Sequence, residues 1–292
     1  MPDLFATYLV SVLNGVAIGV LLFMMAVGLS LIFGLMDVLN LAHGAVFLIG
    51  SYVAFDVAGS GDGGFLLAVA AALAVGLLVG GGLAVSLRPL RRRGHLDQVL
   101  LTLGIAFVLL NTSAMVWGDD FRSVPAPTAL QGSGALLGQS YPVYRLAVIV
   151  IGFVVAALVY AVFERSRLGA ILRAMVDDRD MVDALGVDTR ALTGGVLAAG
   201  SGLAAVGGVI GAPILSIRPG LEWEVLILAL IVVVIGGLGS VKGAFVGALL
   251  IGQVQSLGVA LLPEFAAFGL FGAMAVVLLV RPDGLFGQVA TG

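Results

Sequence analysis

The sequence predicts an all-α membrane protein, a polytopic bundle of about eight or nine transmembrane helices. Its 292 residues are 61% hydrophobic and only 11% charged, and the mean hydropathy is +1.19. Soluble domains carry about 25% charged residues, so this chain has too few charges to cover a water-facing surface of its size. The composition excludes a soluble enzyme, a nucleic-acid-binding protein and a disordered chain. We expect a single transmembrane domain over residues 1–292.

Apolar runs account for the predicted helices, because a membrane span needs about 20 mostly apolar residues. The first run is too long for a signal-peptide core, and no small-residue cleavage pattern follows it, so we expect an uncleaved span. The seventh is short for a full crossing, which leaves the count at eight or nine. The runs cover residues 9–33, 41–57, 65–87, 99–117, 143–163, 191–215, 225–235, 244–262 and 265–280.

The 43 glycines predict close contact between these helices. Association in lipid depends on close backbone approach, and small residues four positions apart provide flat contact faces. Such pairs recur along the chain, for example Gly76 with Gly80. Because a composition this rich in glycine also produces such pairs by chance, the pattern indicates a tight bundle without singling out one pair.

The basic residues predict the orientation of the chain in the membrane. Nine of the 14 Lys and Arg residues lie in two stretches, residues 88–93 and 165–190. Cytoplasmic loops of membrane proteins are enriched in Lys and Arg. We therefore expect both stretches in the cytoplasm and the polar loop 118–142 outside. With nine crossings, the N-terminus is outside and the C-terminus is cytoplasmic.

Two glycine-bounded breaks interrupt the apolar pattern. The first, residues 34–44, contains Asp37, Asn40, His43 and Gly44, and the second, residues 236–243, has the sequence GGLGSVKG. Broken helices often form transport sites, because irregular backbone at membrane depth must face protein or a water-filled cavity. Both breaks therefore either line a substrate path or form short cytoplasmic turns. His43 could likewise contact substrate, or hydrogen-bond a helix-end carbonyl or Asp37.

Residues 164–190 form a charged segment between two spans. Apolar residues recur in it at roughly helical spacing, acidic residues take the other positions, and Gly186 is placed to end a helix. This pattern predicts a short amphipathic cytoplasmic helix. Its acidic face is unsuited to a negatively charged inner leaflet, so a protein partner is favoured over lipid headgroups.

Residues for catalysis are missing from the sequence. It contains no phosphate-binding loop, no H-E-x-x-H and no G-x-S-x-G motif, and its cysteine count is zero. We therefore expect no catalytic residues, no cofactor and no metal site. If transport is driven by ATP, a separate chain must supply the ATPase.

Several motifs, in order along the chain, resemble the permeases of high-affinity branched-chain amino-acid ABC transporters. Residues 28–34 (GLSLIFG), 38–44 (VLNLAHG) and 49–52 (IGSY) resemble the N-terminal signature of the family. Residues 166–169 (SRLG) and 185–189 (LGVDT), with Arg173, Ala174 and Asp178, resemble its coupling loop. Residues 236–244 are similar to its late glycine motif, in which Pro is common where this chain has Lys242. Residues 281–287 (RPDGLFG) resemble its C-terminal ending.

The resemblance implies an ABC importer permease in the bacterial plasma (inner) membrane. Such a chain forms half of a pore beside a homologous or identical second permease. Two cytoplasmic ABC ATPases and an external substrate-binding protein complete the importer. The coupling helix, about residues 177–185, would sit in a groove of the ATPase. Candidates for ATPase coupling are Leu172, Met175, Asp178, Val182, Leu185 and Gly186, and candidates for the translocation path are Asn40, His43, Gly44, Gly237 and Gly239.

Other functions remain open at this stage. A branch of the same family transports urea or short amides. A stand-alone secondary transporter or channel would usually need ionisable groups within the spans, and few are present. A non-transporting scaffold would suit the amphipathic segment but would leave the two breaks without a purpose.

Overall fold

The computed structural model describes residues 2–36, 39–60, 62–90, 94–136 and 139–287. Within these ranges, nine helices have 15 residues or more. They are α1 (Pro2–Met36), α2 (Ala42–Val57), α3 (Asp62–Leu87), α4 (His95–Trp117), α5 (Val143–Glu164), α8 (Thr189–Gly211), α9 (Leu221–Gly236), α10 (Val241–Leu261) and α11 (Ala266–Val280). Two short helices, α6 (Arg167–Asp177) and α7 (Arg179–Ala184), fill the segment between α5 and α8. Each predicted apolar run therefore corresponds to one helix.

Six of the described helices are long and apolar enough to cross a membrane by themselves. They are α1, α3, α4, α5, α8 and α10, while α2 and α11 are shorter apolar helices. Helix α9 has 16 residues and carries Glu222 and Glu224 in its first turn. The structure is consistent with an all-α polytopic bundle, and the choice between eight and nine crossings stays open.

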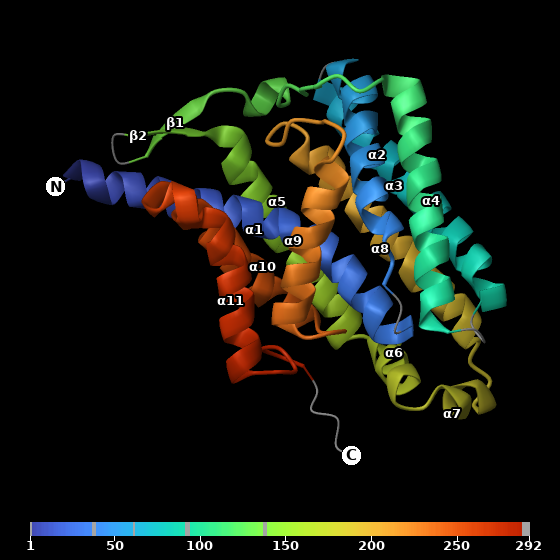
Figure 1. The fold of residues 1–292 in the computed structure, drawn as a ribbon. Helices are drawn as coiled ribbons and strands as arrows, with labels where there is room; N and C mark the ends of the chain where they lie inside the picture. The colour runs from blue at the N-terminus through green and yellow to red at the C-terminus, as the bar shows by residue number, and fades with distance from the viewer. Residues whose placement is uncertain (1, 37–38, 61, 91–93, 137–138, 288–292) are drawn as a thin grey trace.

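Helix α1 lies at the centre of the bundle. It runs obliquely through the molecule and packs against α5, α8, α9 and α10 (Figure 1). Consecutive side chains from Val20 to Ile32 are buried on every side of the helix. A helix that is hydrophobic all round belongs in the interior. The outer helices α3, α4 and α11 instead expose large apolar side chains, as lipid-facing helices do.

Close helix contacts occur where the glycine pairs predict them. A Cβ at Gly76 would lie 2.6 Å from the Ser201 carbonyl oxygen, and one at Gly80 would lie 2.6 Å from the Leu197 carbonyl oxygen. Both partners belong to α8, so these two glycines let α3 and α8 approach at backbone distance. The apposition fixes α8 between α3 on one side and α1 and α2 on the other.

The loops divide between two ends of the bundle. At the hairpin end, the predicted loop 118–142 contains two short strands, β1 (Ser133–Leu136) and β2 (Gln139–Pro142), which pair antiparallel. Residue Arg122 of this loop pairs through its backbone with Ile217, which follows α8. At the opposite end lie α6, α7, the end of α1 and residues 88–90 (Figure 1). Both Arg-rich stretches therefore flank the same end, although Arg91, Arg92 and Arg93 lie outside the described residues.

Candidate functional site

Two polar residues of the first break, Asn40 and His43, lie inside the bundle. Asn40 is buried, and its side-chain oxygen accepts a hydrogen bond from the Ala42 N–H at 3.1 Å, at the start of α2. His43 is fully buried, and its Nε2 lies 3.1 Å from the Met25 carbonyl oxygen of α1. These bonds support the structural interpretation of His43. Asp37, its other expected partner, lies outside the described residues.

Gly44 is a packing residue at the contact between α2 and α9. A Cβ at this position would overlap the carbonyl oxygen of Glu222, which is itself buried in the first turn of α9. A larger side chain at position 44 cannot fit without moving one of the two helices. Proximity to substrate for Asn40, His43 or Gly44 stays a prediction.

The second break is an irregular turn between two helices. Helix α9 ends at Gly236, and Gly237 and Gly239 then take φ values of +96° and +76°, a region that glycine adopts most readily. The Ser240 side chain accepts a hydrogen bond from the Gly243 N–H at 3.0 Å and so begins α10. The turn reaches back to α1, where the Ser30 hydroxyl accepts the Gly239 N–H at 3.1 Å.

Residues 281–287, which follow α11 and are called the C-terminal tail below, complete this turn. The N–H groups of Leu285 and Phe286 donate to the carbonyls of Ile235 and Gly236 at 2.8 and 3.0 Å. The final carbonyls of a helix have no partner within it, so the tail satisfies two such groups of α9. Gly284 sits directly against Gly237. The late glycine motif and the C-terminal motif thus form one structural unit, a relationship that their separation in sequence concealed.

The segment 164–190 contains two helices where the sequence predicted one. The prediction of a single helix is wrong because Asp178 has extended backbone and its side chain accepts the Met181 N–H at 2.9 Å, which starts α7 anew. Gly186, with φ of +83°, ends this helix as predicted. Gly169 fixes the angle between α5 and α6, because a Cβ there would overlap the Phe163 carbonyl oxygen.

Three of the predicted ATPase anchors point into the protein's own core. Leu172, Met175 and Val182 are 4%, 5% and 3% exposed. Leu185 is 74% exposed, so it alone of the four apolar candidates is available to another chain as the structure stands. The sequence pattern identified an amphipathic segment correctly, but it could not indicate that the apolar face already packs against this subunit.

A polar network joins α7 to α8. The Arg179 guanidinium donates to the Thr189 and Thr193 hydroxyls, both at 3.2 Å, and the Thr189 hydroxyl donates to the Asp183 carboxylate at 2.7 Å. The hydrogen bond from the Thr189 side chain holds the pKa of the Asp183 carboxyl below its usual range. Asp183 is exposed to solvent and at the same time links α7 to α8.

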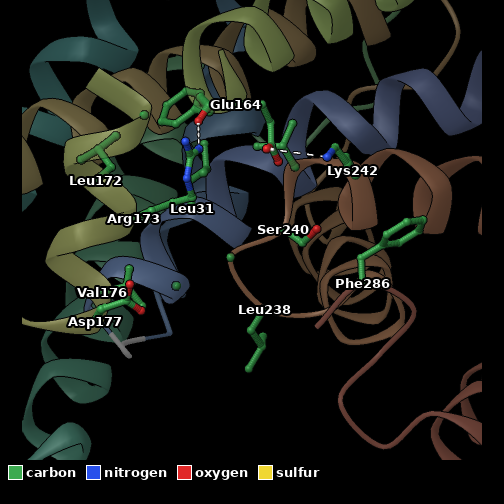
Figure 2. A pocket seen from close by; sticks show the side chains of 15 residues that line it. Leu31, Glu164, Leu172, Arg173, Val176, Asp177, Leu238, Ser240, Lys242 and Phe286 are labelled. Atoms are coloured by element: carbon green, nitrogen blue, oxygen red, sulfur yellow. Dashed lines mark hydrogen bonds and ion pairs between the residues drawn. The ribbon is translucent and has the colours of Figure 1, made fainter. Parts of the chain in front are cut away.

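A cavity of about 430 Å³ lies where these parts meet. Helix α6 forms one side of it, the second break and the start of α10 form the other, and the end of α1 lies behind (Figure 2). Glu164 and Lys242 form an ion pair across it, with Nζ 3.8 Å from Oε2. Its lining is Leu31, Gly34, Phe163, Glu164, Gly169, Leu172, Arg173, Val176, Asp177, Leu238, Gly239, Ser240, Val241, Lys242 and Phe286.

The cavity brings together only some of the candidates named from the sequence. Gly239 and Leu172 line it, and Gly237 lies behind it against the tail. Asn40, His43 and Gly44 are not among the lining residues. Glu164, Arg173 and Lys242 were missed as site residues, and the signal that could have found them is the pairing of opposite charges beside the two motifs.

The known proteins that resemble this chain are all described as permeases of branched-chain amino acid transport. The family model described as "Branched-chain amino acid transport system / permease component" matches residues 11–280. The chain is 30% identical to the high-affinity branched-chain amino acid transport system permease protein BraD of Pseudomonas aeruginosa, over 99% of this chain and 98% of that protein. It is 29% identical to the permease protein LivH of Escherichia coli K12, with the same coverage. A probable permease of Methanocaldococcus jannaschii, LivM, is 27% identical over 77% of this chain and 69% of its own length.

No solved structure matches the chain. The family match nevertheless extends from the first third of α1 to the end of α11 and includes both breaks and the segment 164–190. The chain therefore belongs to the permease-component family of branched-chain amino acid transport systems.

Proposed function

We propose that this chain is the membrane permease subunit of an ATP-driven importer for branched-chain amino acids. The observation that carries the proposal is the family match over residues 11–280, together with relatives of that name aligned over nearly the whole chain. In the proposed assembly the chain pairs with a second permease subunit, two cytoplasmic ATPases and an external substrate-binding protein. ATP is hydrolysed on the partner chains.

The segment 164–190 is the proposed coupling element. To the candidates from the sequence we add Met181, which is exposed on the same surface. Leu185 and Gly186 lie at its exposed turn, beside Met181 on α7. Gly169 ties the segment to α5 and the Arg179 network ties it to α8, and both of these helices contact α1. A displacement of α6 and α7 would then move α5 and α8 about the central helix, a rigid-body change of the kind that switches access.

The function is tested by reconstitution. The tagged chain is purified from the membranes of its own cells with its associated proteins and placed in proteoliposomes. We expect labelled leucine to be imported with ATP and not with a non-hydrolysable ATP analogue. Import without ATP would instead support a stand-alone transporter. ATP-driven import of urea and not of leucine would assign the chain to the amide-transporting branch.

Orientation is tested separately, because this chain has no cysteine. We propose that the α6–α7 end is cytoplasmic and the hairpin end external. Asp180 and Gln131 are exposed at the two ends. A membrane-impermeant thiol reagent applied to intact cells should label Gln131→Cys and leave Asp180→Cys unlabelled until the cells are permeabilised. The reverse pattern would contradict the orientation.

The coupling role is tested at Leu185. Leu185→Asp places a charge where an apolar anchor would be buried in the ATPase, which is strongly unfavourable. Because the side chain is 74% exposed in this subunit, the variant should fold normally yet lose the co-purifying ATPase. Asp180→Asn, an exposed change on the same helix, is the matched control. If Leu185→Asp retains the ATPase and full transport, this residue is not an anchor.

A further inference from the structure

We infer that the cavity between α6, the end of α1 and the second break binds an apolar, zwitterionic α-amino acid. The inference rests on the proposed function and deepens it, because it gives the chain an amino-acid site of its own at the α6–α7 end. Its evidence is the size, the wall composition and the charge arrangement of this cavity.

The cavity has the size of a small-molecule site. Its volume of about 430 Å³ falls within the range of about 300–1,000 Å³ that is usual for ligand pockets. It is reached from the surface, because Val176 and Leu238 on opposite sides of it are about half exposed. Figure 2 shows Val176 on α6 and Leu238 on the second break, with Arg173 and Lys242 on the same two sides.

The walls provide both charges that an amino acid carries. Arg173 uses one guanidinium N–H for the Phe163 carbonyl, which leaves further donors of its five for a ligand carboxylate. The Lys242 ammonium is 3.8 Å from Glu164, beyond hydrogen-bond distance, which leaves its N–H donors available to a ligand carboxylate. The carboxylates of Glu164 and Asp177 lie on the same lining and suit an ammonium group.

The remaining walls are apolar. Leu31, Leu172 and Val176 face the cavity from α1 and α6, and Leu238 and Phe286 face it from the break and the tail. A branched aliphatic side chain would be partly desolvated among them, against the buried Leu31 and Leu172 and the half-exposed Val176, Leu238 and Phe286. An inorganic anion or a nucleotide fits less well, because two acidic side chains accompany the two basic ones. A free amino acid with an aliphatic side chain matches the basic, the acidic and the apolar residues of the lining.

The test measures binding of tritiated L-leucine to the full-length chain in lipid nanodiscs, with no substrate-binding protein present. Leucinol lacks the carboxylate and 4-methylpentanoate lacks the ammonium. Each should compete at least about tenfold less well than leucine, since each forfeits charge-assisted hydrogen bonds. Equal competition by either analogue would overturn the assignment of a zwitterion.

Two sets of variants locate the site. Leu238→Trp should fill the cavity and weaken leucine binding at least about tenfold, whereas Leu279→Trp on the exposed face of α11 should not change it. Lys242→Gln should weaken binding and Lys242→Arg should restore it. Binding that is unaffected by Leu238→Trp, or absent from the wild-type chain, would overturn the inference.

Three further outcomes separate the alternatives. Leucine binding in detergent that disappears in nanodiscs containing phosphatidylethanolamine would show that a lipid headgroup occupies the cavity, and would overturn the inference. The uptake assay with the purified assembly is independent of this site. If leucine is imported but the chain alone binds none, only the inference fails. If the assembly imports no amino acid, the proposed function fails.

Discussion

Asn40 and His43 of the first break are buried inside the bundle, whereas residues 238–242 of the second break line a cavity, which Gly34 at the start of the first break also reaches. In the first, Asn40 and His43 are buried, and the Asn40 Nδ2 and His43 Nδ1 atoms have no hydrogen-bond partner among the described residues. In the second, the turn is satisfied by Ser30 of α1 and by the C-terminal tail, and Gly239 lines the cavity. The first therefore fixes helix positions, and the second offers a surface to ligands or partners.

Gly44 of the first break differs from Gly237 and Gly239 of the second. Gly44 lies within α2, where the lack of a side chain admits the backbone of α9. Gly237 and Gly239 have positive φ, so they are needed first for their backbone conformation. The comparison teaches that similar glycine-containing interruptions in a membrane sequence can serve helix packing in one place and turn geometry in another.

Substitution at Gly44 is expected to cause the largest loss of stability. Gly44→Leu should destabilise the chain by about 3 kcal/mol or more, because the new side chain must displace the backbone at Glu222. The measurement is the thermal unfolding midpoint and the yield of purified protein. Gly104→Leu, on the exposed face of α4 with open space around it, should remain near wild type. A well-folded Gly44→Leu variant would show that α2 and α9 are less tightly packed at Gly44 than described.

Substitution at Gly284 tests the tail that completes the second break. Gly284→Ala combines a backbone with φ of +83° and a Cβ that would lie 2.6 Å from the Gly237 nitrogen. We expect a loss of about 2 kcal/mol or more. Gly186→Ala has the same φ but open space around it, so it should cost only the backbone strain. Equal losses of stability in the two variants would contradict the packing of Gly284 on Gly237.

The side chains that bond the first turns of α2 and α10 provide the smallest and most direct comparison. Asn40→Ala and Ser240→Ala each remove a side-chain acceptor from a helix N-terminus, a loss of about 1 kcal/mol. Asn40→Ala should cost more, because it also leaves a buried void, whereas water can replace the Ser240 hydroxyl beside the cavity. Denaturation of both variants under one condition tests this order. A larger loss for Ser240→Ala would contradict the description of Asn40 as buried and Ser240 as accessible to water.

Much of the fold could be predicted from the sequence because membrane helices are specified locally. Each apolar run became a helix, and Gly186 ended α7 where the pattern indicated. The contacts of the site were harder to predict. Nothing local shows that Leu172 and Val182 pack inward, or that Leu285 bonds to Ile235. These features depend on which helices are neighbours. Helical periodicity shows which face of a helix is apolar, but it does not show which other segment packs against that face.

The tail that caps α9 also has a consequence for the order of folding during synthesis. The carbonyls of Ile235 and Gly236 receive their partners from Leu285 and Phe286, which the ribosome adds only after α10 and α11. The second break therefore cannot reach its final form while the chain is still growing. The side of the cavity that the second break forms is complete only in a finished molecule, so an incompletely synthesised permease would present an unfinished surface to any partner at that end.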